Sequence, residues 1–246
     1  MFSVIFEVHR KAEKVEEYLD LAMGLKSTLQ TIDGFIDNER FESQLRPGWL
    51  LSHSTWRDEK SVIRWRVTQK HHHVQERGRF EIFSDYRLRV GEITADTEPP
   101  KGIQVSEQRF DESEIGESAC VTLTELFFGD EAKCDRHVAT LAQELQLPSG
   151  KEAGLLASDV FKSISTIYPD NRPHRPGKLA LLATWSDAAA GAKWEPRPLE
   201  GSTVRHRRVR VIRDYGMFDR REAPQYYDDV DSRRPTLHAA PRTSSD

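Results

Sequence analysis

The stretch His71-His72-His73-Val74-Gln75-Glu76-Arg77-Gly78-Arg79 carries the side chains best suited to chemistry. Three successive imidazoles on a helix point about 100° apart, so they cannot all bind one metal ion. Zinc hydrolases use two histidines four residues apart with a glutamate between them, and this pattern is absent here. No metal site is therefore predicted. His71 is suited to serve a pocket as an acid, a base or a heme ligand. The alternative is that all three histidines lie on a solvent-exposed helix face.

Three other residues each allow two interpretations. Trp65 either anchors a core or lines a pocket for a flat aromatic molecule. Arg79 either binds an anionic group or lies in solvent, and Tyr86 either donates a phenolic hydrogen bond or is an ordinary half-buried strand tyrosine. No isolated carboxylate pair, phosphate-binding glycine loop, dinucleotide fingerprint or nucleophile motif accompanies them. Flavin or nicotinamide binding is therefore supported by no motif.

The positions of these side chains depend on the helices and strands that the sequence predicts. Apolar residues at helical spacing predict amphipathic helices, and runs rich in Val, Ile and Phe predict buried strands. Asp58 is predicted to cap the helix that carries Trp65, and Asp187 is predicted to be a helix cap as well. In chain order we expect a strand over residues 2–8, a helix over 14–29, strands over 35–41 and 49–56, a helix after residue 58 and a strand over 80–90. This β-α-β-β-α-β order is typical of a ferredoxin-like domain.

The same unit is predicted to occur twice. Thr55-Trp56-Arg57-Asp58 followed by Trp65 recurs as Thr184-Trp185-Ser186-Asp187 followed by Trp194, with equal spacing between the tryptophans. In the second copy we expect strands over residues 119–127, 179–185 and 204–215 and a helix over 130–145. The chain is therefore predicted to be α+β, with two tandem ferredoxin-like domains over residues 1–93 and 119–222, the second degenerate. A linker over residues 94–118 joins them, and residues 223–246 form a disordered tail.

The two closing strands can be aligned in two ways. The tryptophan spacing places Asp85-Tyr86 on Asp214-Tyr215, whereas the alternating arginines place Arg87-Leu88-Arg89-Val90 on Arg208-Val209-Arg210-Val211. We prefer the second alignment because it matches an alternating pattern on a strand. It implies that the second copy lacks the counterpart of residues 71–78. Any site is then expected in the first copy, and the second copy is expected to be mainly structural.

Composition narrows the choice of partners. A net charge of −4 over 246 residues gives no reason to expect nucleic acid or an anionic membrane as a partner. The N-terminus has no basic segment before its apolar run, and no apolar run approaches the length of a membrane span. Cys120 and Cys134 are expected to be buried thiols, with an isolated redox pair as the alternative. We expect a cytoplasmic protein that acts on a small-molecule substrate.

A group of short segments carries a family resemblance. They are Val4-Ile5-Phe6-Glu7-Val8, Ile32-Asp33-Gly34-Phe35, Thr55-Trp56-Arg57-Asp58-Glu59, Trp65-Arg66, His71, Gln75, Gly78-Arg79 and Asp85-Tyr86-Arg87-Leu88-Arg89-Val90. Together they resemble the antibiotic biosynthesis monooxygenase (ABM) family, well over residues 1–93 and more weakly over 119–127 and 179–222. The resemblance implies a dimeric α+β barrel, which the two copies are expected to form within one chain as an internal pseudo-dimer. A homodimer of chains is the alternative.

The resemblance implies two kinds of chemistry. Some members of the ABM family oxidise polycyclic aromatic phenols with molecular oxygen and no metal or flavin, in a dry pocket with a few polar groups. Others bind heme through a histidine after the second helix and cleave it. His71 stands where close single-copy relatives carry a histidine, whereas the heme-degrading members place theirs nearer Gln75.

The leading prediction is a monooxygenase that oxidises an aromatic or quinol-like small molecule with O2. His71 would be the acid–base group and Arg79 would stabilise developing negative charge. Trp65 and Tyr86 would bind the substrate. No cofactor is expected, with heme as the alternative. The competing functions are a non-catalytic small-molecule-binding or stress-related module and a heme-binding or heme-degrading protein.

Overall fold

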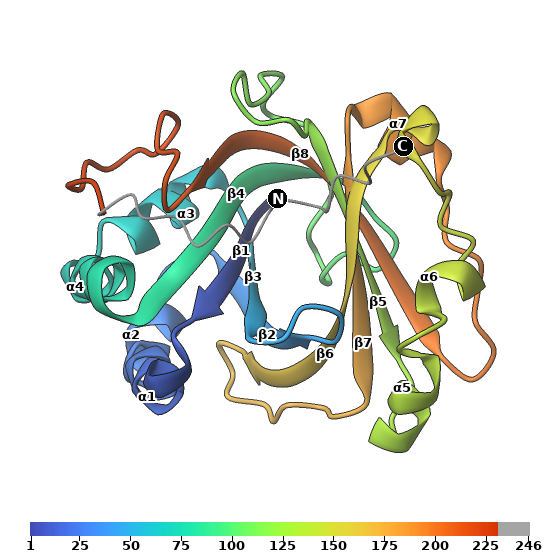
Figure 1. Cartoon of the computed structure of the whole chain (residues 1–246), viewed down its shortest axis with the longest axis horizontal. Coiled ribbons are helices and arrows are strands. Elements are labelled where there is room, and N and C mark those ends of the chain that lie inside the picture. The colour runs from blue at the N-terminus through green and yellow to red at the C-terminus, as the bar shows by residue number, and fades with distance from the viewer. Residues whose placement is uncertain (231–246) are drawn as a thin grey trace, which may run out of the picture.

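Eight strands close into one antiparallel barrel, with helices packed around its outside (Figure 1). The computed structural model describes residues 1–230. The order of strands around the barrel is β1-β3-β2-β6-β7-β5-β8-β4. The strands are β1 (Phe2–Arg10), β2 (Phe35–Ser43), β3 (Trp49–Trp56), β4 (Phe83–Asp96), β5 (Cys120–Phe127), β6 (Leu155–Ile167), β7 (Lys178–Trp185) and β8 (Thr203–Gly216).

Two groups of helices lie on opposite sides of the barrel (Figure 1). The first group is α1 (Val15–Gly24), α2 (Lys26–Gln30), α3 (Glu59–Arg66) and α4 (Gln69–Arg77), and the second is α5 (Glu131–His137), α6 (Leu141–Glu144) and α7 (Ala188–Lys193). Short helical turns are η1 (Ala12–Lys14), the π-helical η2 (Gly78–Ile82) and η3 (Lys151–Ala153). Asp58 and Asp187 cap α3 and α7 through the N–H groups of Ser61 and Ala190, which confirms the predicted caps.

The chain contributes four strands to each half of the barrel in the same order. The first half runs β4-β1-β3-β2 and the second runs β8-β5-β7-β6, and the halves join through the β2–β6 and β4–β8 pairs. Phe2 pairs with Trp56 in the first half, as Cys120 pairs with Trp185 in the second. A mixed α and β chain built around a closed barrel is therefore present, as predicted.

The register of the closing strands corrects the alignment preferred above. Ile5 pairs with Arg89 on one side of the barrel, and Leu123 pairs with Arg207 at the equivalent place. Arg89 thus corresponds to Arg207, and the predicted match with Arg210 was wrong. The error arose because β8 repeats its arginines at alternating positions, so that its sequence pattern fits more than one register. The expected loss in the second half is confirmed, since β8 follows α7 with no counterpart of α4 between them.

Several predicted boundaries differ from the structure. The expected strand over residues 80–90 begins only at Phe83, after the π-helical turn, and continues to Asp96, inside the predicted linker. Residues 155–167, for which no strand was predicted, form β6, which joins the two halves. The helices expected over residues 14–29 and 130–145 are each split into two shorter helices.

The remainder of the predicted linker is irregular but attached to the barrel. Its backbone N–H groups at Gln108 and Arg109 donate to the buried carboxylate of Glu92, and Ile103 and Val105 pack against the apolar residues inside the barrel. Most of the predicted tail, residues 231–246, lies outside the described part of the chain. Within that described part, no helix has the length and apolar character needed to cross a membrane.

The two halves are filled differently beneath their helices. In the second half, Trp185 and Trp194 pack with ring centroids 5.8 Å apart inside a dense apolar cluster that also holds Leu141 and Leu145. The free cysteines Cys120 and Cys134 are buried in the same cluster, in agreement with the predicted buried thiols. The equivalent space in the first half is partly open and forms the pocket described next.

Candidate functional site

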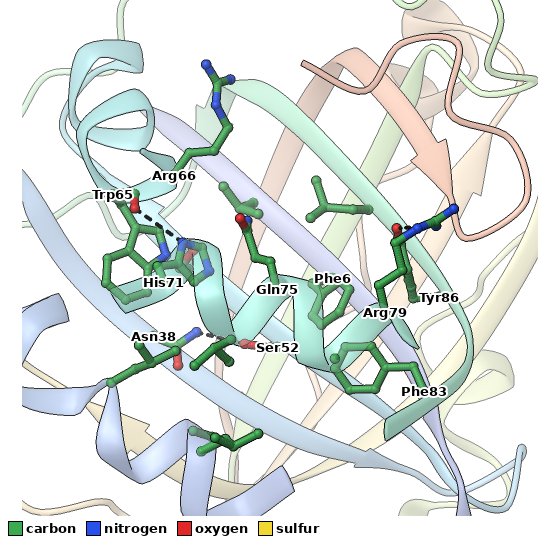
Figure 2. Close-up of a pocket in the computed structure, with 18 of the residues that line it drawn as sticks. Phe6, Asn38, Ser52, Trp65, Arg66, His71, Gln75, Arg79, Phe83 and Tyr86 are labelled. Carbon is green, nitrogen blue, oxygen red and sulfur yellow. Dashed lines mark hydrogen bonds between the residues drawn. The ribbon is translucent and has the colours of Figure 1, made fainter. Parts of the chain in front are cut away.

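A pocket of about 200 Å³ lies between the outer face of the first-half sheet and helices α1 to α4 (Figure 2). Trp65, His71, Arg79 and Tyr86, the four residues predicted from the sequence, all line it. The structure therefore brings these side chains together although they come from α3, α4, η2 and β4. His72 and His73 are exposed and do not line the pocket, in agreement with the solvent-facing alternative for those two residues.

The register of the strands determines the floor of the pocket. Alternate side chains on a strand face opposite sides of a sheet. Val4 and Phe6 therefore face the pocket, while Ile5 packs inside the barrel. Two rows of side chains cross the floor: Val90, Val4, Ser54 and Asn38 form one, and Leu88, Phe6, Ser52 and Arg40 form the other. The Asn38 amide donates to the Ser52 hydroxyl at 2.9 Å (Figure 2).

His71 is stacked on the indole of Trp65. The two ring centroids are 4.1 Å apart and the ring planes differ by 16° (Figure 2). Nδ1 of His71 lies 3.2 Å from the carbonyl oxygen of Trp65. Because a carbonyl oxygen only accepts, Nδ1 carries the proton and Nε2 of the neutral ring is a proton acceptor. Burial lowers the pKa of His71 to about 4, so the ring is neutral near pH 7.

Local structure explains how Trp65 and His71 meet. Asp58 fixes the start of α3, and Trp65 lies in the last turn of that helix. The chain turns at Val67 and Thr68, and α4 begins at Gln69, so that His71 lies in its first turn. Gln75 lies one helical turn further along the same face and also lines the pocket. One edge of the mostly polar helix α4 therefore faces the pocket, and the rest of the helix is exposed.

Arg79 is buried, with 2% of its surface exposed, which excludes the predicted solvent alternative. Nη1 of Arg79 donates to the Met217 carbonyl at 2.7 Å and to the Tyr86 hydroxyl at 3.2 Å. The π-helical turn that carries Arg79 requires glycine at position 78, because a Cβ atom there would come within 2.5 Å of the Phe83 ring. The tyrosine is also buried and lies beside the arginine (Figure 2).

The segment after β8 returns to the first half and covers the edge of the pocket. It lies beside α3 and α4 in Figure 1. Arg220 donates to the Tyr86 hydroxyl at 2.7 Å, and the Asp228 carbonyl accepts from Arg79 at 3.0 Å. The ring of Tyr227 stacks on His72 with centroids 5.5 Å apart. Residues 223–230, which were expected to be disordered, are thus packed on the site.

Sequence reasoning missed two groups of site residues. The second half was expected to be structural only, yet Tyr215 of β8, Arg220 and Tyr227 line the pocket. Their approach depends on the β4–β8 joint, which no local pattern reveals. Asn38 and Arg40 were also missed, although polar residues at alternate positions of an otherwise buried strand are a usable signal.

Charged ligands for a metal ion are not gathered in the pocket. In the part of the chain that the structure describes, no group of three or more His, Cys, Asp or Glu side chains is placed to hold a metal ion. The polar groups that line the pocket are instead amides, hydroxyls, one imidazole and several guanidinium groups. These groups suit the binding of an organic molecule that has an anionic or hydrogen-bonding part.

Comparison with known proteins places the chain in a family. Residues 1–77 match the family model described as antibiotic biosynthesis monooxygenase. The jasmonate monooxygenase ABM of Pyricularia oryzae (strain 70-15 / ATCC MYA-4617 / FGSC 8958) is 37% identical over 231 residues, which cover 92% of this chain and 98% of the relative. This chain belongs to the antibiotic biosynthesis monooxygenase family.

Solved structures compare with this ABM chain at the level of fold. An aldoxime dehydratase in complex with butyraldoxime aligns with a TM-score of 0.52 and 11% identity, covering 85% of this chain and 79% of the other. An anthrone oxidase-like protein aligns with a TM-score of 0.34 and 14% identity, covering 91% and 96%. The first comparison concerns the fold alone, and the second is too weak to support an argument.

The ABM match covers only part of the pocket. It includes Trp65, His71 and Gln75 but ends before Arg79 and Tyr86. The cluster around the Tyr86 hydroxyl therefore lies outside the matched segment, and Arg220 reaches it from the far end of the described chain. In this ABM protein, one end of the pocket therefore lies inside the segment that the family model matches, and the other end lies outside it.

Proposed function

We propose that this protein is a monooxygenase that oxidises a flat aromatic or quinol-like small molecule with O2 in the first-half pocket. The observation that carries the proposal is the stack of His71 on Trp65, which leaves Nε2 as a proton acceptor in a mostly apolar pocket. A neutral imidazole beside an indole face suits a substrate that must stack and lose a proton. Family membership supports the same reaction class.

The proposed reaction uses the substrate as the source of electrons. Nε2 of His71 takes a proton from a phenol or enol, and the resulting anion transfers an electron to O2. Recombination of the two radicals forms a C–O bond and gives a hydroperoxide once a proton returns to oxygen. Loss of water from a carbon that bears a second hydrogen then leaves a carbonyl. Arg79, which is hydrogen-bonded to Tyr86, supplies positive charge near the developing oxyanion.

No bound cofactor is needed for this scheme, and we propose that none is used. Heme bound through Nε2 of His71 is the alternative, because a backbone acceptor on Nδ1 is a common support for an axial histidine. Titration with hemin separates the two. A saturable Soret shift that is lost in His71→Ala would replace the cofactor-free proposal with the heme protein.

The substrate class has two candidates. The stacked rings favour a flat aromatic or quinol-like molecule. The relative from Pyricularia oryzae is named a jasmonate monooxygenase, and its match over nearly the whole chain favours jasmonate or a similar small acid. A non-catalytic binding module is the competing function. It predicts ligand binding without oxygen consumption.

Oxygen uptake is the experiment that tests the proposal. Purified protein is supplied with hydroquinones, polycyclic aromatic phenols and jasmonic acid, and O2 consumption is recorded with His71→Ala beside it. The matched control is His73→Ala, since His73 lies on the same helix but is exposed and does not line the pocket. Uptake that survives in His73→Ala and is lost in His71→Ala supports the proposal. Uptake unaffected by His71→Ala removes that residue from the chemistry.

We also propose that the chain is a tandem duplication of one ferredoxin-like unit, paired internally as a pseudo-dimer. The equal strand order of the two halves and the equivalent Phe2–Trp56 and Cys120–Trp185 pairs support this. A closed barrel within one chain makes pairing between chains unnecessary. Light scattering should then give the mass of one chain, 28.3 kDa. The mass of two chains would show that the barrel also associates.

A further inference from the structure

Four arginines line the first-half pocket, and none of them has a carboxylate partner within residues 1–230. They are Arg40, Arg66, Arg79 and Arg220. No Asp or Glu of the described chain lines this pocket either. Elsewhere the protein commonly places arginines against acids, as in the pairs Arg57–Asp33 and Arg205–Asp96. The pocket therefore concentrates positive charge in a mostly apolar setting.

Two of the four, Arg40 and Arg66, each have a buried Nε atom without a hydrogen-bond partner among the described residues. Arg40 is the more buried of these two, with only 9% of its surface exposed, whereas Arg66 is half-buried. Arg79 and Arg220, by contrast, donate to carbonyl groups and to Tyr86. A buried N–H group without a hydrogen-bond partner is costly, and an anion that accepts from it recovers that cost. Arg40 is therefore poised for a ligand rather than for a contact within the fold.

The pocket floor is divided into a polar and an apolar strip. The polar strip consists of Asn38 and Arg40 on β2 and Ser52 and Ser54 on β3. The apolar strip consists of Val4 and Phe6 on β1 and Leu88 and Val90 on β4. Because each row across the sheet runs from one strip to the other, a ligand that spans the floor meets hydrogen-bond donors at one end only.

We propose that the pocket binds an amphipathic organic anion, with its carboxylate or similar oxyanion held by Arg40 on the polar strip. Its apolar body lies over the apolar strip and against Trp65. This inference rests on the proposed function, since it names the chemical class of the substrate of that same pocket. Planar guanidinium groups bind carboxylates through two parallel hydrogen bonds, so Arg40 fixes the orientation of the ligand as well as its charge.

Two fluorescent dyes with the same rings test the proposal without turnover. Anilinonaphthalene sulfonate carries an anionic group, and phenylnaphthylamine is the corresponding neutral molecule. Dissociation constants for both are measured by fluorescence titration with the wild type, Arg40→Met and Arg40→Lys. The control is Arg64→Met, because Arg64 is exposed on α3 and contacts Asp33 outside the pocket. Binding of the neutral dye also reports that each variant keeps its pocket.

The measured quantity is the affinity for the anionic dye relative to the neutral dye. We expect this ratio to fall about tenfold in Arg40→Met, to recover in part in Arg40→Lys and to stay constant in Arg64→Met. A ratio unchanged by Arg40→Met, an equal loss for both dyes, or no binding of the anionic dye to the wild type would overturn the inference. Those outcomes leave the monooxygenase proposal standing, because that proposal is judged by oxygen uptake alone.

Discussion

Arg89 on β4 donates a hydrogen bond to Thr184 on β7, in the other half of the chain, with 2.8 Å between Nη1 and Oγ1. Its counterpart Arg207 on β8 donates to Thr55 on β3 across 3.1 Å. Both threonines belong to the repeated Thr-Trp segments seen in the sequence. The repeated Thr-Trp segments therefore form two equivalent contacts between the halves, each with an arginine of the opposite half.

Replacing Arg89 should destabilise the barrel. The arginine is 1% exposed and pairs with the buried carboxylate of Glu7, which among the described residues keeps only Arg46 as an ion-pair partner in Arg89→Met. We expect a loss of about 3 kcal/mol in the free energy of unfolding, measured with urea. The double variant Glu7→Gln/Arg89→Met should lose less, because no charge is then left without its partner. Arg57→Met, at an exposed ion pair, should change stability by at most about 1 kcal/mol. If Arg89→Met cost no more stability than Arg57→Met, the buried pair of Arg89 and Glu7 would not be a main stabilising contact of the barrel.

His71 should make the protein less stable in acid. Its folded-state pKa of about 4 lies below the ordinary value of 6.5, so the unfolded chain binds more protons between those two pH values. This contribution to stability is present above pH 6.5 and is lost as the pH falls toward 4. In His71→Gln the decline over that window should be shallower, as measured by urea unfolding at several pH values. Parallel curves for the wild type and the variant would mean that His71 titrates normally.

Glu39 should have the opposite dependence on pH. Burial, together with the charge of Glu125, raises the pKa of Glu39 to about 7 from an ordinary 4.5. The folded state therefore binds more protons than the unfolded chain in this window, and stability falls as the pH rises from 4.5 through 7. Glu39→Gln should remove this fall, whereas Glu42→Gln, at an exposed position on the same strand, should keep it. Persistence of the fall in Glu39→Gln would assign it to another group.

The segment after β8 should matter for turnover. Arg220 donates to the Tyr86 hydroxyl at 2.7 Å and holds that group beside Arg79. We expect Arg220→Met to lower kcat/KM about tenfold with any substrate found by oxygen uptake, because the hydroxyl is no longer positioned. Arg221→Met is the control, since Arg221 is exposed and pairs only with Asp219 among the described residues. Equal activity in the two variants would show that Arg220 serves packing alone.

The sequence predicted the parts of the fold that local patterns determine. Asp58 and Asp187 were identified as caps because a carboxylate before a helix satisfies free N–H groups whatever the tertiary context. The strands with apolar residues on both faces were found because a buried strand needs little alternation. β6 was missed because the residues near its N-terminal end are exposed, so its sequence lacks the continuous apolar run of a buried strand. The predicted register of β8 was wrong because arginines recur at alternating positions of this strand, so that its pattern fits more than one pairing.

The candidate site was predictable only where it is local in the chain. Trp65, His71, Arg79 and Tyr86 lie within a short segment, and the structure brings all four to one pocket. Arg220 reaches the same pocket from far along the chain, through the pairing of β4 with β8. Such a contact depends on how the barrel closes. No spacing within either copy contains that information.

Because one chain encodes both halves of the barrel, a substitution in one half leaves the other half unchanged. In a barrel of two identical subunits every substitution is made twice, so neither cavity can be filled without filling the other. Here Trp194 and its neighbours occupy the space beneath one sheet, while the space beneath the other is open around Trp65. Separate encoding frees one half to become a solid support. The other half can then adapt its cavity to a new molecule without a stability cost on both sides.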